Sequence, residues 1–538
     1  MLGEVDCANF DGSETFSDRG PVVRPSDTIP IMQPTMTTIE DEIRKLKRDE
    51  SLLFLNHVLS VSRGHTNDPQ LATELAKLRS RPLGHVIHFL SKQLLLHSSI
   101  VGRFVLDWPR FIHLMNMQTA LEDAIQHDPK WKHANPAGLL ERLLAQQLPS
   151  QDRKIVQKYG LGLGLFRDVG PITWPKRYDL PNAIETELGM SVERFMAIGN
   201  ICGLIPEPPL LGNVPHLGRF TSRSLTEAFD QGLRVCVPEI YGPFLQRVAC
   251  NRDAFRILCQ QEEYKATDPL YAQFEFNPLF RFPITELGPN NYLTVDYELV
   301  VRRTTLGLFY DLFERHRTNF SEFLEPFGHV FDKFVGMLLA SVSPSQMLWS
   351  SAAWEESTQT KIPGKVCDRA YLGPVNTILL ECKSLRPTLK LTTYGAEDSV
   401  EKFIERIAEA MTQLIGHDES IQAGLWARAG IPQRPTAAFV IVTYGQFYTA
   451  NTPFIRNRVV EQLQQVGLQS RPFVILSLED LDSVVRLIEI GHSFDEIILR
   501  LSGPVASLND YPELAEHAIS RFSIDRGTDF LQRLNTIK

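Results

Sequence analysis

The sequence is poor in cysteine, and none of its cysteines stands in a CxxC pair. Seven cysteines are spread singly over 538 residues, which argues against a zinc ribbon and favours a reducing compartment. Long apolar runs are also missing, because the richest, at residues 334–342, has roughly half the length that a membrane span requires. We therefore expect a cytoplasmic protein that has no transmembrane helix and no membrane partner.

An excess of positive charge is absent as well. The chain has 55 Lys and Arg residues against 64 Asp and Glu residues, which gives a formal net charge of -9 at pH 7. A protein with this balance is expected to be soluble, and it does not bind nucleic acid over its whole surface. Any contact with nucleic acid must therefore be local.

The chain divides into segments of different composition. Residues 1–37 are rich in Asp, Ser, Thr, Pro and Gly, lack the basic start and apolar stretch of a secretory signal, and are predicted to be a disordered tail. Residues 38–205 show apolar residues at helical spacing and are predicted to form a helical domain. Residues 206–320 begin with a stretch rich in Pro and Gly and are predicted to form a helical and irregular connecting domain.

The pattern changes after residue 321. Helical patterns now alternate with β-rich runs at residues 365–371, 377–384, 437–444 and 471–478. Such alternation is typical of a mixed α/β domain whose sheet is covered by helices. We therefore predict a multi-domain protein, with a mainly α-helical amino-terminal region followed by an α/β domain at residues 321–538.

Three polar residues of this α/β domain form a pattern that suits metal chemistry. Side chains alternate along the run 377–384, so Glu381 and Lys383 lie on one face while the opposite face is apolar. A hairpin would bring the carboxylate of Asp368, on the preceding run, close to Glu381. Two carboxylates suit a hard divalent cation such as Mg²⁺. Such a cation could hold a phosphate and activate water, which Lys383 would orient.

The order of these residues, Asp368, a short loop and then Glu381-Cys-Lys383 at the end of an apolar strand, resembles the PD-(D/E)XK nuclease superfamily. The family is also called restriction-endonuclease-like. Residues 328–335 (GHVFDKFV) are similar to its first core helix and place Asp332 at the acidic position, where Glu is commoner. The resemblance covers residues 323–501 and implies an α/β domain with a mixed central sheet.

The resemblance also implies a function. The protein would be a nuclease that uses Mg²⁺ or Mn²⁺ to hydrolyse phosphodiester bonds, in DNA. Asp368, Glu381 and Lys383 would be the catalytic residues. The metal would be held by Asp368 and Glu381, with the backbone carbonyl of Cys382 assisting and Asp332 completing the acidic cluster.

Further features extend the resemblance. Gln413, on a predicted helix that covers the sheet, is similar to an accessory polar residue near the site, although His417 replaces the aromatic residue that usually follows it. The arrangement as a whole resembles bacterial nucleases that act in defence against foreign DNA. The helical region would then recognise the substrate, a second copy of the chain or an activating partner protein, and would restrain the nuclease.

Other interpretations of the same residues stay open. Glu381 and Lys383 could form a salt bridge on an exposed edge strand, although residues 378–380 are too apolar for such a strand. The domain could also be a catalytically silent nuclease-like module that binds nucleic acid or assists assembly. Residues 160–164 (GLGLG) mimic a phosphate-binding loop, but no strand precedes them and no Lys-Ser/Thr follows, so they predict a flexible turn.

Local positive charge gives separate support for contact with nucleic acid. Six basic residues stand between residues 361 and 390, against only two acidic residues, which are the proposed ligands. This excess suits binding to a phosphate backbone, although a basic edge that discourages strand aggregation would have the same composition. The six residues are Lys361, Lys365, Arg369, Lys383, Arg386 and Lys390.

Overall fold

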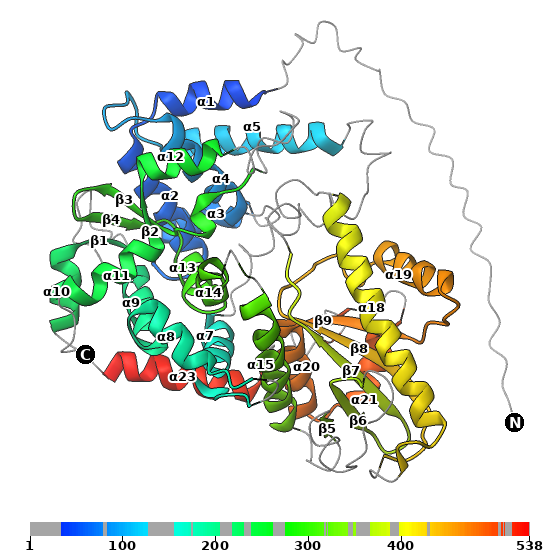
Figure 1. Ribbon diagram of the computed structural model, residues 1–538. Helices are drawn as coiled ribbons and strands as arrows, with labels where there is room; N and C mark the ends of the chain where they lie inside the picture. Colours follow the sequence, from blue (N-terminus) through cyan, green and yellow to red (C-terminus); the bar gives the residue numbers. More distant parts are fainter. Residues whose placement is uncertain are drawn as a thin grey trace, which may run out of the picture.

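The structure is a computed structural model. It describes residues 34–78, 83–126, 155–173, 176–204, 218–230, 238–261, 275–316, 319, 321–342, 348–350, 366–387, 397–427, 431–503, 507–508, 511 and 519–536. Most of the predicted tail, residues 1–33, lies outside this part of the chain. Within it the protein is mainly helical and contains two β-sheets (Figure 1). None of the described helices combines the length and the apolarity that crossing a membrane requires.

The first helices form a core together with a later part of the chain. Their apolar side chains pack against residues from the segment 250–299, so this core is built from two distant stretches of sequence. The bounds are α1 (Met36–Arg44), α2 (Arg48–Ser62), α3 (Pro69–Ala76), α4 (Leu83–His97) and α5 (Trp108–Gln126).

The middle of the chain contains a small mixed sheet, which the sequence did not predict. Its strands are β1 (Arg219–Thr221), β2 (Ala249–Asn251), β3 (Ile284–Gly288) and β4 (Asn291–Thr294), in the order β1-β4-β3-β2. They are too short for a clear alternation of apolar and polar residues. The helices around them are α8 (Leu180–Leu188), α9 (Val192–Leu204), α10 (Ser222–Asp230), α11 (Pro238–Val248), α12 (Arg252–Gln260), the 3-10 turn η6 (Pro278–Phe280), α13 (Tyr297–Thr304) and α14 (Leu308–Arg315).

The flexible turn predicted at residues 160–164 is wrong. These residues end the buried helix α7 (Ile155–Leu163) and begin the π-helix η3 (Gly164–Asp168). A Cβ atom on Gly160 would lie 2.2 Å from the backbone oxygen of Ser523, which belongs to α23 (Arg521–Thr536). The glycine is therefore needed for close contact between two helices, and it has no part in phosphate binding.

This contact predicts an unusual response to substitution. Ala is ordinarily favoured over Gly within a helix by up to about 1 kcal/mol. We expect Gly160→Ala instead to lower the free energy of unfolding by about 2 kcal/mol, because the new methyl group forces α7 and α23 apart. Gly416→Ala is the matched control, since its Cβ meets nothing within 4 Å. Urea unfolding should show loss of stability for the first variant alone, and equal stability of the two variants would refute the packing argument.

The carboxy-terminal region contains a mixed five-stranded sheet, as expected of an α/β domain. The strand order is β5-β6-β7-β8-β9, in which β5, β6 and β7 pair antiparallel and β7, β8 and β9 pair parallel. All four predicted β-rich runs contain a strand, whereas β5 was not predicted. The strands are β5 (Leu348–Ser350), β6 (Arg369–Leu372), β7 (Thr377–Lys383), β8 (Thr436–Thr443) and β9 (Phe473–Ser477).

Helices cover both faces of this sheet. Leu379 and Ile441 face α18 (Glu397–Gln422) and α19 (Pro453–Gln465), and α18 runs across the sheet in Figure 1. Ile378 and Leu380 face the opposite core, which α15 (Ser321–Ala340), α20 (Leu478–Glu489) and α21 (Phe494–Leu501) help to form.

That second core extends beyond the α/β region. It includes residues of α7, α9 and α23, and α23 lies against α7 in Figure 1. Residues 155–204 therefore share a core with the sheet, although they precede it by more than a hundred positions. The predicted domain boundaries stay a prediction.

Candidate functional site

The site is built where strands β6 and β7 separate. Their ladder ends at the pair Arg369 and Leu380, and Asp368 stands just before it. The backbone N–H of Asp368 donates to Oε2 of Glu381 at 3.3 Å, and Oδ2 of Asp368 accepts from the backbone N–H of Cys382 at 2.7 Å. The hairpin thus brings the two residues into contact, but through the backbone N–H of Asp368, while the carboxylate of Asp368 is bound by Cys382.

On the α18 face, Glu381 and Lys383 contact each other. Nζ of Lys383 lies 2.7 Å from Oε1 of Glu381 and donates to Oε1 of Gln413 at 2.9 Å. Strand β7 is the central strand of the sheet, and Glu381 is only 4% exposed. The interpretation of this pair as a salt bridge on an exposed edge strand is therefore wrong. Gln413, the accessory residue expected from the resemblance, is in direct contact with Lys383.

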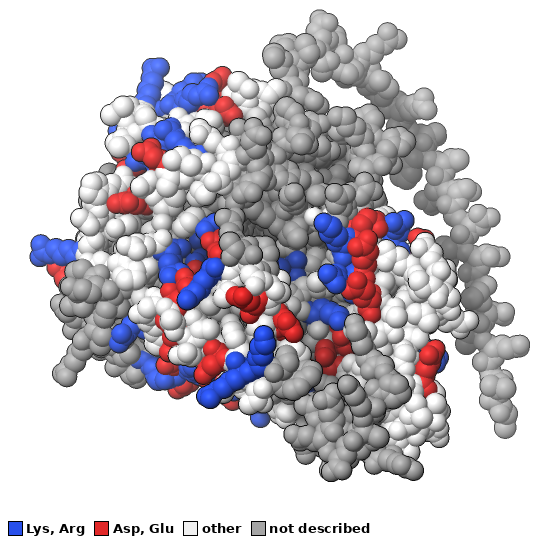
Figure 2. Space-filling view, in the orientation of Figure 1, with Lys and Arg blue, Asp and Glu red and all other residues white. Residues whose placement is uncertain are grey.

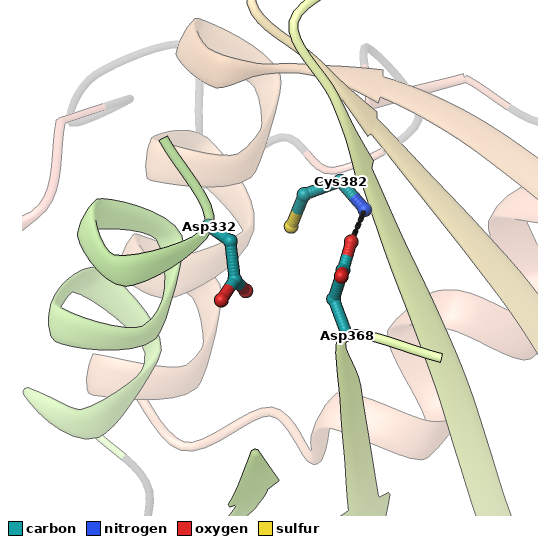
Figure 3. Close-up of side chains that lie close together, drawn as sticks. All are labelled: Asp332, Asp368 and Cys382. Carbon is teal, nitrogen blue, oxygen red and sulfur yellow. Dashed lines mark hydrogen bonds between the residues drawn. The ribbon is translucent and has the colours of Figure 1, made fainter. Parts of the chain in front are cut away.

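On the opposite face, a second group of ligand atoms comes together. A carboxylate oxygen of Asp332, a carboxylate oxygen of Asp368 and Sγ of Cys382 all lie within 4.8 Å of one another (Figure 3). Asp332 comes from α15, whereas Asp368 and Cys382 come from the hairpin. Glu381 is not a member of this group. The four proposed metal residues are therefore divided between the two faces of β7, and Asp368 contacts both sides.

The face of β7 opposite Glu381 is accordingly not wholly apolar, contrary to prediction. Alternation along the strand predicts Cys382 on that face, and its thiol lies there, but so do the carboxylates of Asp332 and Asp368, which the prediction of an apolar face did not include.

Asp332 has a basic partner that the sequence analysis missed. Nε of Arg369 lies 2.9 Å from Oδ1 of Asp332, and Nη2 of Arg369 donates to the backbone oxygen of Asp332 at 2.7 Å. The guanidinium crosses α15 at Gly336, where a Cβ atom would lie 2.3 Å from it. No pattern in the sequence reveals this pairing, because it joins a helix and a strand that are far apart along the chain.

The pKa values of the carboxyl groups of the site are raised above their ordinary values. Burial raises the pKa of Glu381 to about 8, and the charge of Asp368 adds to this effect while Lys383 opposes it. Burial likewise raises the pKa of Asp332 to about 7, with Arg369 opposing and Asp368 adding. The pKa of Asp368 is also raised by burial. One buried and two half-buried acidic groups face two basic ones, so a divalent cation fits the charge of the site.

The basic residues near the site are mostly engaged within the fold. Arg369 pairs with Asp332, and the guanidinium carbon of Arg386 lies 4.1 and 4.0 Å from the ring centroids of Phe309 and Phe313. In Figure 2 the described Lys and Arg side chains are mixed with Asp and Glu over the visible face. Arg369 and Arg386 therefore do not form the phosphate-binding surface suggested by composition. The other basic residues of that stretch, Lys361, Lys365 and Lys390, lie outside the described residues.

No protein-family model, curated protein or solved structure matches the chain.

Proposed function

We propose that the protein is a metal-dependent nuclease of the PD-(D/E)XK type that hydrolyses phosphodiester bonds, in DNA. The observation that carries the proposal is the convergence of Asp368, Glu381 and Lys383 at the end of one hairpin. Gln413 adds weight, because it was expected near the site and contacts the lysine that would act on the nucleophile.

The surroundings of the hairpin agree with the resemblance. A helix that carries Asp332 precedes the sheet, the sheet is mixed, and the helix that carries Gln413 covers it. These are the features expected of a restriction-endonuclease-like domain. A cytoplasmic location and a role in defence against foreign DNA stay predictions.

The donor set suits Mg²⁺ or Mn²⁺. Asp368 and Asp332, whose carboxylate oxygens lie within 4.8 Å of each other, would hold the ion, and Glu381 would join them from the α18 face, with the carbonyl of Cys382. Burial and the charge of Asp332 raise the pKa of the Cys382 thiol far above its ordinary value, so the sulfur is protonated and is a poor ligand in the metal-free protein. When bound, the ion would polarise the phosphate and lower the pKa of water.

The side chains themselves prepare the site for this chemistry. Glu381 and Gln413 both accept from Nζ of Lys383 and hold the ammonium group in one place. From there Lys383 would orient the attacking water or offset negative charge that develops on the phosphate. The backbone N–H of Cys382 donates to the carboxylate of Asp368 and so fixes the orientation of that side chain.

The proposal is tested by metal-dependent cleavage. The full chain is incubated with supercoiled plasmid, linear duplex or single-stranded DNA, in Mg²⁺, in Mn²⁺ or in EDTA. We expect cleavage with either metal, and a fall to the background rate in EDTA, because the buried carboxylates cannot activate water alone. Cleavage that persists in EDTA would contradict the proposal.

Binding of DNA without cleavage in any buffer would instead favour the catalytically silent module. A nuclease that requires an activating partner would behave differently again. It would show no basal cleavage, yet it would be toxic in cells, and the toxicity would disappear with Asp368→Ala.

A further inference from the structure

One turn beyond Gln413 on α18, His417 contacts the residue that precedes Asp368. Nδ1 of His417 accepts from the backbone N–H of Cys367 at 3.3 Å and lies 2.8 Å from Sγ of the same residue. Both side chains are almost completely buried, with exposed fractions of 3% for His417 and 2% for Cys367. His417 and Gln413 are four residues apart and therefore lie on the same side of the helix.

The backbone of Cys367 needs a partner at this point. The β6–β7 ladder ends at Arg369, so no strand pairing serves the N–H of Cys367. A buried N–H without an acceptor would cost free energy, and the imidazole ring provides the acceptor. The thiol adds a second link, because Sγ of Cys367 also lies 3.1 Å from the backbone oxygen of Arg369. Asp368 lies between Cys367 and Arg369 in the chain, and these contacts hold the backbone on both sides of it.

The ring of His417 is itself held in place. Its centroid lies 4.3 Å from the ring centroid of Trp426, which is 1% exposed. The next residue, Asp418, accepts from Oγ1 of Thr436 at 2.5 Å and pairs with Arg471 at 3.0 Å, which ties this turn of α18 to the sheet. Burial lowers the pKa of His417 to about 4. The ring is therefore neutral at pH 7, and since its Nδ1 accepts, its proton lies on Nε2.

We propose that His417 is a positioning residue, which fixes the backbone of Cys367 and thereby the direction in which Asp368 presents its carboxylate to the metal. The inference rests on the proposed function, because it names the support of that same metal site. The signal in the sequence was the replacement of an expected aromatic residue by histidine. A histidine at this position can accept a hydrogen bond from the strand, which phenylalanine cannot do.

The test compares His417→Ala with His417→Asn in the full chain. Asn places Oδ1 close to the position of Nδ1 and can accept the Cys367 N–H, whereas Ala cannot. Mn²⁺ binding is followed by the loss of the electron paramagnetic resonance signal of free Mn²⁺. We expect the dissociation constant to rise about 10-fold in His417→Ala, as for other residues that orient a metal ligand, and to return to within 2-fold of the wild-type value in His417→Asn.

Leu414→Ala is the matched control. Leu414 is fully buried on the same helix, and its truncation weakens the same core without removing the bond to Cys367. An unchanged Mn²⁺ dissociation constant in His417→Ala would overturn the proposal. So would a loss of affinity in Leu414→Ala as large as that in His417→Ala, or a failure of His417→Asn to restore binding.

Amide hydrogen exchange of the segment 366–372 separates this inference from the proposed function. The segment should exchange at least about 10-fold faster in His417→Ala and at the wild-type rate in His417→Asn, because the bond protects the Cys367 amide directly. This result is expected even if the protein proves not to cleave DNA. Equal exchange in all three proteins would overturn the positioning role, whatever the outcome of the cleavage assay.

Discussion

Glu381→Gln is expected to reduce metal-dependent DNA cleavage by about 10³-fold, the upper range for loss of one group that stabilises a transition state. The substitution keeps the shape of the side chain and removes its charge. It therefore leaves the contact with Lys383 possible but takes away one of the two carboxylates expected to hold the metal. Binding of DNA should be retained, because a negative charge is lost. Cleavage rates and DNA affinity are measured on the same preparation, with Mn²⁺ at several concentrations.

Glu405→Gln is a suitable control for this variant. Glu405 lies on α18 and is exposed, so the substitution changes the net charge by the same amount without touching the site. It should cleave DNA at the wild-type rate. Full activity of Glu381→Gln would remove Glu381 from the catalytic set. Loss of DNA binding along with cleavage would indicate a damaged fold.

Arg369→Met should lower the free energy of unfolding by about 2 kcal/mol in EDTA at pH 8, where Asp332 is charged, since the carboxylate loses its charged partner. Arg369 is 8% exposed and forms an ion pair with Asp332. Once Arg369 is removed, the carboxyl group of Asp332 lies near that of Asp368 and has no guanidinium group to offset its charge. Urea unfolding with and without Mn²⁺ measures the effect.

Adding Asp332→Asn to Arg369→Met should recover most of the lost stability, because the uncompensated charge is then removed as well. Mn²⁺ should stabilise the single variant more than the double variant if Asp332 is a ligand, since a ligand that binds the folded state more tightly stabilises it more at the same concentration. Equal stability of the single and double variants in EDTA would show that the Arg369–Asp332 pair contributes nothing. Equal stabilisation of both by Mn²⁺ would exclude Asp332 from the metal site.

The sequence predicted best what depends on neighbouring residues. Four of the five strands of the carboxy-terminal sheet were located from short β-rich runs. The contact between Glu381 and Lys383 followed from alternation along one strand, because residues two apart always share a face. The hairpin that joins Asp368 to Glu381 was also predicted from neighbouring residues, because a short turn leaves two consecutive strands few other ways to pair.

Features that depend on distant parts of the chain were not predicted. The pairing of Asp332 with Arg369 requires knowledge of which helix covers which face of the sheet, and alternation does not provide this. The same is true of Gly160, whose partner Ser523 lies near the other end of the chain. The strands β1 to β4 were missed for a different reason, because β1 and β2 have only three residues each, and Pro283 and Pro289 make the segment of β3 and β4 resemble a loop.

The position of α23 bears on how this protein is made. Phe530 packs against Tyr159 of α7, and Phe522 packs against Phe334 of α15, so the last helix covers apolar surface that is translated much earlier. A nascent chain emerges from the ribosome starting at its amino terminus. Asp368, Glu381 and Lys383 therefore emerge while the core beneath them is still open. The core that Phe530 shares with the sheet can be completed only after Phe530 has been synthesised.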